Sequence, residues 1–209
     1  MLFKDRRDAG QQLAGALQGY LGQGALILAV PRGGVLVAVP VVKALDAEMD
    51  LIIPRKVGLP ANPEVAAAAV APDGTVLYND KVLEACHLTP ADLQAAVDRE
   101  LAEIKRRLTL YRGNRPLPVM RGRLVIIVDD GIATGLTIKA ALKSVRKYKP
   151  RRLVLAVPVA PPDTLTVLRL MVEDLVCLAA PEPFYAVGQF YRDFRQVSDA
   201  EVKACLEGC

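Results

Sequence analysis

The stretch Leu124-Val-Ile-Ile-Val-Asp-Asp-Gly-Ile-Ala-Thr-Gly-Leu-Thr137 decides the fold of this 209-residue chain. Its five apolar residues predict a strand that is buried on both faces, as in a parallel sheet covered by helices. Asp129 and Asp130 follow at the carboxyl end of that strand, and small residues then lead into a helix expected over 137–148. Ligands bind beyond the carboxyl ends of strands in open parallel sheets, so this segment predicts a ligand site.

The loop after the two aspartates has the features of a phosphate-binding site. Gly131 and Gly135 allow tight turns that direct main-chain N–H groups into one cavity, and Thr134 and Thr137 supply hydroxyl donors. The positive end of the following helix adds to the attraction for an anion. Two carboxylates so close to this loop suit vicinal ribose hydroxyls or a magnesium ion better than a phosphate. The segment therefore describes a site for a ribose 5-phosphate.

Other phosphate-binding motifs do not fit the sequence. The chain has no GxxxxGK[ST] motif of ATP-binding loops and no GxGxxG motif of dinucleotide folds. The remaining alternative is a structural one, in which the two aspartates only cap a loop.

Outside this segment, helical and strand patterns alternate along the chain, which favours an α/β fold with a parallel twisted sheet flanked by helices. We expect core strands at residues 25–30, 50–54, 124–128, 153–159 and 174–178. We expect helices at residues 8–21, 35–45, 137–148 and 163–170, and a last helix that Ser198 and Glu201 begin as a capping box.

The middle of the chain departs from this alternation. Gly, Pro and Asn residues predict a loop over 57–63, and Asp73-Gly74 predicts a hairpin between strands 67–70 and 75–78. Residues 79–118 predict a helical insertion with one apolar stripe, formed by Leu93, Val97, Leu101, Ile104, Leu108 and Tyr111. The stripe suits packing on the main sheet or on a second copy of the chain. We predict a single domain over 1–209, with this insertion and a hood-like segment at 181–209.

Composition narrows the class of protein. The hydrophobic fraction of 52% suits a large core, and no apolar run reaches the roughly 18 residues of a membrane span. The charged start of the chain predicts no signal peptide, hence a cytoplasmic protein. Four separated cysteines, Cys86, Cys177, Cys205 and Cys209, predict neither a zinc site nor a disulfide framework. Basic runs at 105–107 and 146–152 are typical of solvated helix ends, so we expect no nucleic-acid partner.

The stretch VIIVDDGIATGLT resembles the motif that binds 5-phosphoribosyl 1-pyrophosphate (PRPP) in type I phosphoribosyltransferases. The resemblance implies that Asp129 and Asp130 are catalytic residues that hold the ribose hydroxyls. It also implies that they bind magnesium, directly or through water. The residues that would wrap the 5′-phosphate are Ala133, Thr134, Gly135, Leu136 and Thr137.

Two further segments resemble the same family in the expected order. The loop at 30–34, which contains Arg32, Gly33 and Gly34, resembles the short loop that holds pyrophosphate. Arg55 and Lys56, after the second predicted core strand, resemble the basic pair that reaches pyrophosphate and assists its departure. Either segment alone is weak support. An ordinary tight turn could have the sequence of the first, and a solvated basic pair could have that of the second.

From about residue 3 to the final helix, the chain resembles a bacterial subgroup of predicted phosphoribosyltransferases whose acceptor is unassigned. Residues 55–64 and 184–194 carry this likeness. It implies magnesium-dependent transfer of the phosphoribosyl group to a nitrogenous acceptor, in nucleotide metabolism, by a homodimer. Asn62 and Glu64 lie in a predicted lid and either touch the acceptor or the metal, or only form a turn.

Departures from the family pattern bear on the acceptor. At Ala133, relatives that act on 6-oxopurines carry an aspartate, so such an acceptor is not expected. Leu136 replaces a frequent glycine but keeps its main-chain N–H. A non-catalytic PRPP-binding regulator, including one that binds nucleic acid through 146–152, is an alternative. A phosphatase or PRPP hydrolase is another.

Overall fold

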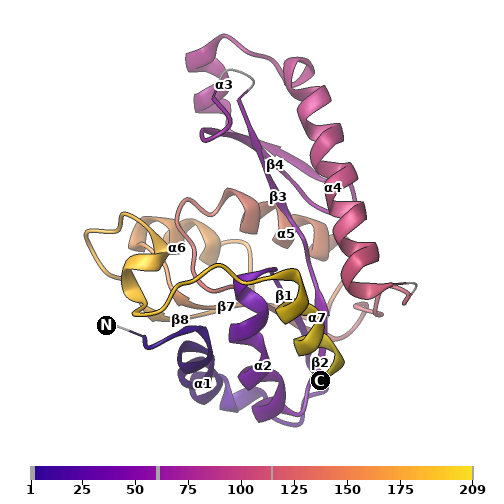
Figure 1. The fold of residues 1–209 in the computed structure, drawn as a ribbon, viewed down its shortest axis with the longest axis vertical. Helices are drawn as coiled ribbons and strands as arrows, with labels where there is room; N and C mark the ends of the chain where they lie inside the picture. The colour runs from indigo at the N-terminus through magenta and orange to yellow at the C-terminus, as the bar shows by residue number, and fades with distance from the viewer. Residues whose placement is uncertain (1–2, 60–61, 114, 209) are drawn as a thin grey trace. The chain divides into compact units, whose positions relative to one another are not determined.

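The structure, a computed structural model, describes residues 3–59, 62–113 and 115–208. The chain divides into two compact units (Figure 1). The first consists of Met1–Ile52, Leu117–Thr134 and Tyr148–Cys209, and the second of Ile53–Pro116 and Gly135–Lys147. The predicted single domain with an insertion and a hood-like segment stays a prediction. Cys209 and residues 60–61 of the predicted loop lie outside the described residues.

The first unit is built on a five-stranded sheet in the order β2-β1-β6-β7-β8, in which every pair is parallel. This confirms the predicted parallel α/β fold. The strands are β1 (Leu26–Ala29), β2 (Glu48–Leu51), β6 (Leu124–Val128), β7 (Arg152–Val159) and β8 (Asp174–Ala179). Strand β6 is the middle strand and is buried along its whole length, as its unbroken apolar run predicts.

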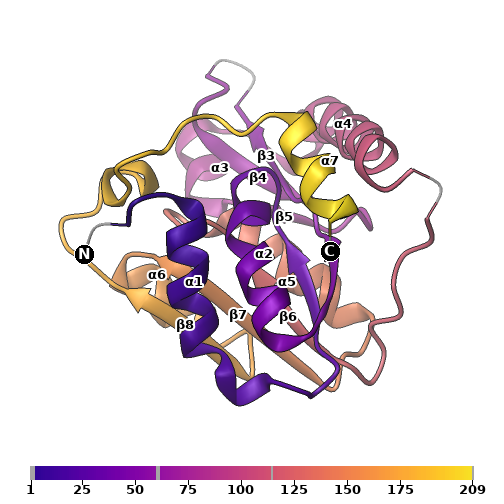
Figure 2. The same ribbon diagram turned by 60° about the horizontal axis from the view of Figure 1, so that its bottom comes forward.

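Helices cover this sheet within the first unit. They are α1 (Arg6–Ala16), α2 (Gly33–Leu45), α6 (Pro162–Arg169) and α7 (Asp199–Glu207), with 3-10 turns η1 (Gln18–Tyr20) and η3 (Val187–Phe190). Helices α1 and α2 lie side by side (Figure 2). A side chain at Gly10 would place its Cβ 2.4 Å from the Val37 carbonyl oxygen, so the absence of one allows this close packing. The capping box of Ser198 and Glu201 at the start of α7 is confirmed.

The second unit contains a small antiparallel sheet in the order β3-β4-β5, with bounds Arg55–Gly58, Ala66–Val70 and Val76–Tyr78. The predicted hairpin is confirmed, and Gly74 takes the positive φ of 82° that its turn requires. The helices of this unit are α3 (Asp80–Cys86), α4 (Gln94–Arg112) and α5 (Leu136–Lys147), with the 3-10 turn η2 (Pro90–Leu93). Helix α4 runs along β3 and β4 (Figure 1).

Two predictions about the middle of the chain were wrong. The strand expected at 50–54 is β2, which ends at Leu51. Strand β3 runs from Arg55 to Gly58 and so includes the first two residues of the loop expected at 57–63. Pro54 lacks the N–H that a sheet ladder needs, which explains an interruption between the two strands. Within the second unit, the apolar stripe of the insertion packs on the small sheet, and its buried members are Leu93, Val97, Ile104 and Tyr111. Packing of the stripe on the main sheet or on a second copy stays a prediction.

The start of the described chain pairs with residues 190 and 191 in the first unit. The Phe3 N–H donates to the Phe190 carbonyl oxygen at 2.8 Å, and Phe3 forms a bridge with Tyr191. Their side chains join a buried cluster with Ala9 and Val159. The segment that carries Tyr191 is therefore fixed to the start of the chain. Among the described residues, no helix is long and apolar enough to span a membrane.

Candidate functional site

Asp129 and Asp130 lie directly after β6, at the carboxyl end of the middle strand of the parallel sheet. The Asp130 N–H donates to Asp129 Oδ1 at 2.8 Å, so the first carboxylate caps the turn that carries the second. The Tyr191 hydroxyl donates to the Asp130 carbonyl oxygen at 2.6 Å. The main chain of the acid pair is thereby held from two directions.

The side chain of Asp130 pairs with a residue that the sequence did not indicate. Arg6 Nε lies 2.6 Å from Asp130 Oδ2, and the two side chains keep only 9% and 15% of their surface exposed. Arg6 stands in the first turn of α1, where Asp5 caps the helix by accepting from the Asp8 N–H at 2.8 Å. No local pattern signals this pair, because 124 positions separate its members.

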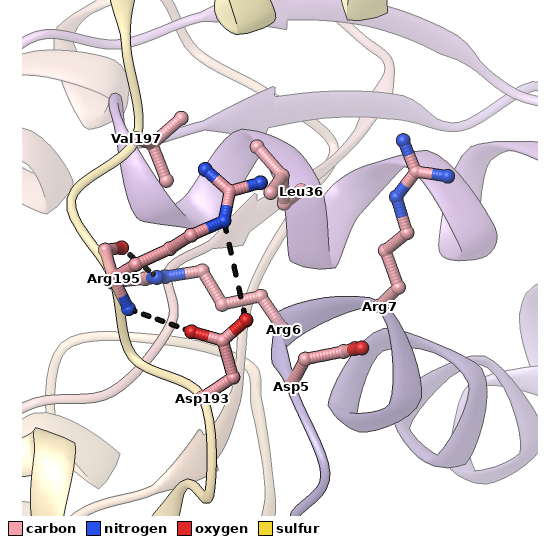
Figure 3. Close-up of a pocket in the computed structure, with 7 residues that line it drawn as sticks. All are labelled: Asp5, Arg6, Arg7, Leu36, Asp193, Arg195 and Val197. Carbon is pink, nitrogen blue, oxygen red and sulfur yellow. Dashed lines mark hydrogen bonds and ion pairs between the residues drawn. The ribbon is translucent and has the colours of Figure 1, made fainter.

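Arg6 is itself held by the C-terminal part of the first unit. Its Nη1 donates to the Arg195 carbonyl oxygen at 2.9 Å, and its guanidinium lies 3.8 Å from the centre of the Phe194 ring. Figure 3 shows the Arg6 side chain extending toward the segment that carries Asp193 and Arg195. A pocket opens at this place, lined by Asp5, Arg6, Arg7, Leu36, Asp193, Arg195 and Val197. Arg195 itself pairs with Glu201 of α7 at 2.6 Å.

The glycines predicted to bind pyrophosphate lie at the start of α2, beside the acid pair. A Cβ at Gly33 would lie 1.8 Å from Asp130 Oδ2 and 2.6 Å from Arg6 Nε. A Cβ at Gly34 would lie 2.8 Å from the Val128 carbonyl oxygen. Both positions must therefore lack a side chain so that α2 can approach the end of β6. This requirement comes from packing, and the role of the glycines toward an anion stays a prediction.

Arg32 precedes these glycines and keeps a partly exposed side chain. Its Nη1 lies 3.8 Å from Asp199 Oδ1 of α7, which is the weak limit of an ion pair. The peptide bond between Pro31 and Arg32 is cis. Arg32 belongs to the same unit as the acid pair, which suits its predicted role toward pyrophosphate.

Burial controls the electrostatics of the acid pair. Loss of hydration, together with the neighbouring Asp130 carboxylate, raises the pKa of Asp129 well above its usual range. Burial also raises the pKa of Asp130, and the Arg6 guanidinium opposes that rise. Burial beside the two carboxylates raises the pKa of Tyr191, so its hydroxyl remains a donor at neutral pH. Among these groups, the Arg6 guanidinium most strongly favours the ionised form of Asp130.

The predicted phosphate loop continues from the acid pair. Gly131 has no room for a side chain, since a Cβ there would lie 2.5 Å from Val187 Cγ1. The Thr164 hydroxyl donates to the Ala133 carbonyl oxygen at 2.8 Å, and Thr134 is exposed. Gly135 takes a φ of 76°, which favours glycine, and Leu136 begins α5. Ala133 and Thr134 end one stretch of the first unit, whereas Gly135, Leu136 and Thr137 open a stretch of the second.

Arg55 and Lys56 belong to the second unit and begin strand β3, whereas the sequence placed them directly after a core strand. Consecutive strand residues point to opposite faces, so the two side chains diverge. Arg55 Nε lies 2.7 Å from Glu100 Oε2 of α4. Lys56 Nζ lies 3.5 Å from Glu64 Oε2 and donates to the Glu64 carbonyl oxygen at 3.1 Å. Both cations therefore have acidic partners, and their role toward pyrophosphate stays a prediction.

The predicted lid residues form a turn. The Asn62 side-chain oxygen accepts from the Glu64 N–H at 3.2 Å, and the Glu64 carboxylate is exposed. The Val65 N–H donates to the Asn62 carbonyl oxygen at 3.1 Å. This is the turn that the sequence left open as an alternative to acceptor or metal contacts, and those contacts stay a prediction.

The acid pair has the kind of ligands that magnesium prefers. The described residues contain no group of three or more His, Cys, Asp or Glu side chains that could hold a metal ion. Mg²⁺ usually needs only one or two carboxylates when phosphates of a substrate and water complete its coordination. Asp129 and Asp130 provide two hard oxygen donors. The pair therefore fits an ion whose other ligands come from a bound pyrophosphate and water.

Comparison with known proteins gives this arrangement a context. Residues 7–194 match the family described as Phosphoribosyl transferase domain. Putative phosphoribosyl transferase Rv0571c of Mycobacterium tuberculosis is 44% identical over 206 residues, which cover 99% of this chain and 46% of that protein. The chain thus spans about half the length of the curated relatives it matches.

The chain is also similar to solved structures. The crystal structure of TT1426 from Thermus thermophilus has 40% identity and a TM-score of 0.82, and the match covers 99% of this chain and 98% of that one. A hypoxanthine-guanine phosphoribosyltransferase from Bacillus anthracis has 14% identity and a TM-score of 0.52, over 90% and 87% of the two chains. This second likeness concerns the fold alone.

Proposed function

Because the chain belongs to the phosphoribosyl transferase domain family, we propose that it transfers the 5-phosphoribosyl group of PRPP to a nitrogenous acceptor and releases pyrophosphate. The observation that carries this proposal is the buried pair of Asp129 and Asp130 at the carboxyl end of β6, followed by the glycine-containing loop into α5. One fold can serve many functions, so the residues of the site, and not the fold, support this function.

In the proposed reaction the acceptor nitrogen forms a bond to C1 of the ribose. The bond from C1 to the pyrophosphate oxygen breaks, pyrophosphate keeps the electron pair, and the acceptor gives up a proton. Asp129 and Asp130 accept hydrogen bonds from the ribose hydroxyls and orient the ring as C1 gains oxocarbenium character. Residues 133–137 donate N–H and hydroxyl groups to the 5′-phosphate.

Charge that develops on the departing pyrophosphate requires cations or N–H donors. We assign this role to Arg32 and the main chain at Gly33 and Gly34, with Arg55 and Lys56 assigned by their resemblance to the family's basic pair. Magnesium bound at the aspartates would neutralise part of the pyrophosphate charge. A homodimer in the cytoplasm is proposed on the same resemblance.

The acceptor is proposed to be a nitrogenous compound other than a 6-oxopurine. Ala133 has no group that could exchange a proton with a purine ring nitrogen, and its side chain is exposed at the loop. Hypoxanthine and guanine should therefore give no pyrophosphate release when mixed with the protein, PRPP and Mg²⁺. A burst of pyrophosphate with either base would contradict this choice of acceptor.

The proposed function is tested by calorimetric titration with PRPP and Mg²⁺. Wild-type protein should bind saturably, and an Asp129→Asn/Asp130→Asn variant should lose binding. Asp163→Asn, which changes an exposed carboxylate in the first turn of α6, serves as the matched control. Absence of binding by the wild type would overturn the proposal. Pyrophosphate release without any acceptor would instead indicate a PRPP hydrolase.

A further inference from the structure

Asp130 is held by residues from the first helix and from the segment that precedes the last helix. Arg6 meets the side chain through Oδ2, and Tyr191 meets the main chain through the carbonyl oxygen, each at 2.6 Å. Phe194 and the Arg195 carbonyl in turn fix the guanidinium of Arg6. We call Arg6, Tyr191 and Phe194 the aspartate clamp. It restricts both the backbone and the side-chain torsions of Asp130.

A purely stabilising role is a poor explanation of this clamp. Burying an ion pair removes hydration from both charges, and apolar residues of similar volume are often as stable or more so. The pair also forces position 33 to lack a side chain, because Asp130 Oδ2 and Arg6 Nε occupy the place of a Cβ. The molecule thus uses several residues to keep one buried carboxylate in a single orientation.

The geometry leaves acceptor capacity on that carboxylate. An ionised carboxylate offers about four lone-pair positions over its two oxygens. Arg6 engages Oδ2 through Nε, whereas its Nη1 is directed to the Arg195 carbonyl, so the pair is not the two-pronged type that would occupy both oxygens. A carboxylate held in this way keeps sites for the hydroxyls of a sugar.

We propose that Arg6 is a positioning residue for the ribose site, acting through Asp130 with the support of Tyr191 and Phe194. The inference rests on the proposed function, since it names how the ribose-binding carboxylate is held. Arg6 lies one position before the residues that match the family, so the match does not include it. Precise orientation of a binding group has a large effect on affinity and rate, because small displacements weaken its hydrogen bonds.

The test compares neighbouring arginines of α1 in calorimetric titrations with PRPP and Mg²⁺. Arg6→Gln should weaken PRPP binding about tenfold or more, as expected for loss of a charge-assisted contact. Arg6→Lys keeps the charge and should restore part of the affinity. The matched control is Arg7→Gln, which changes the exposed next residue and should leave affinity within about twofold of the wild type.

Tyr191→Phe gives a second route if Arg6→Gln fails to fold, because it removes only the hydroxyl that holds Asp130. It should also weaken PRPP binding. An Arg6→Gln/Asp130→Asn variant should bind no more weakly than Asp130→Asn alone, since Arg6 acts through Asp130. Thermal unfolding of each variant separates loss of stability from loss of affinity.

The outcomes separate this inference from the proposed function. If the wild type binds PRPP and folded Arg6→Gln and Tyr191→Phe bind it equally well, the positioning role is overturned and the proposed function stands. Additive losses in the double variant would also overturn it. If the wild type does not bind PRPP, the proposed function itself fails.

Discussion

Gly33 is the residue whose replacement should disturb the site most directly. The Cβ of Gly33→Ala would lie 1.8 Å from Asp130 Oδ2, so the ion pair with Arg6 must open or α2 must shift. Overpacking combined with a broken buried ion pair typically costs about 3 kcal/mol or more. We expect that loss in the free energy of unfolding, measured with urea, and a parallel loss of PRPP binding.

Gly15→Ala is the matched control for this prediction. Gly15 lies in α1 and nothing lies within 4 Å of its added Cβ, so the change should stabilise the protein by about 0.5–1 kcal/mol through helix propensity. If Gly33→Ala were as stable as the wild type, the close approach of α2 to the acid pair would be refuted.

Asp129 leads to a prediction about pH. The pKa of Asp129 is higher in the folded protein than in the unfolded chain. At pH values between these two pKa values, the native state therefore binds more protons than the unfolded state. Stability must then fall as pH rises through that interval. Asp129→Asn keeps an oxygen for the Asp130 N–H and removes the titration. We expect the variant to be more stable than the wild type near neutral pH, with an advantage that shrinks toward acidic pH.

Urea unfolding of both proteins between pH 4 and 8 measures this difference. Asp163→Asn reports the effect of removing an exposed carboxylate and should show no such trend. Parallel pH profiles for Asp129→Asn and the wild type would contradict the raised pKa. Greater stability together with lost PRPP binding would show that the acid pair is kept for ligand binding at the expense of stability.

The contrast between Asp129-Asp130 and Arg6 shows which site residues sequence can indicate. The aspartates follow an apolar strand and precede a glycine loop, so their surroundings in the sequence already identify them. Arg6 lies in a charged first turn, where a solvated arginine is the usual reading. Its partner is distant in the sequence, and only the packing of α1 beside the end of β6 reveals the pair.

At the scale of elements, strands buried on both faces were predicted well because their apolar runs are continuous. Strand β6 has the predicted bounds, and β7 and β8 differ by one residue at an end. The prediction for the segment around Pro54 was wrong for the same reason. Apolar residues continue across it, although the chain leaves one sheet at Leu51 and enters another at Arg55. Period and propensity do not say which sheet a strand joins.

Helix α4 allows a test of the small sheet's core. Ile104 is buried in the stripe that packs on β3 and β4, so Ile104→Ala should lower the free energy of unfolding by about 2–5 kcal/mol. Lys105→Ala changes the exposed next residue and should stay within about 0.5 kcal/mol of the wild type. Urea denaturation measures both. Equal stability of the two variants would mean that the stripe does not form a core in solution.

At the scale of the whole molecule, alternation of helices and strands was enough to predict a parallel sheet. It was not enough to predict two units. The second unit combines 53–116 with 135–147, and nothing local in the sequence says that α5 packs on the hairpin of β4 and β5. Ala69 and Ala140 make that contact, and alanines carry little signal of their partners.

The distribution of charge over the molecule leads to the last prediction, which concerns the regulator alternative. A nucleic-acid surface needs basic side chains that are free to meet phosphates. In the run 146–152, Lys147 lies 3.0 Å from Asp73, and Arg152 lies 3.6 Å from Asp174 and over the Tyr20 ring. Part of the run is therefore neutralised within each unit.

We expect binding to a labelled single-stranded RNA or a DNA duplex to be weaker than about 10⁻⁴ M at physiological salt, the weak end of non-specific binding. Fluorescence anisotropy between 50 and 200 mM KCl measures affinity and its salt dependence. Lys149→Ala/Arg151→Ala removes two other cations of the run and should change nothing. Micromolar binding that this variant abolishes would favour a PRPP-binding regulator that contacts nucleic acid. When the cations that bind phosphates are removed, affinity and its salt dependence should fall together.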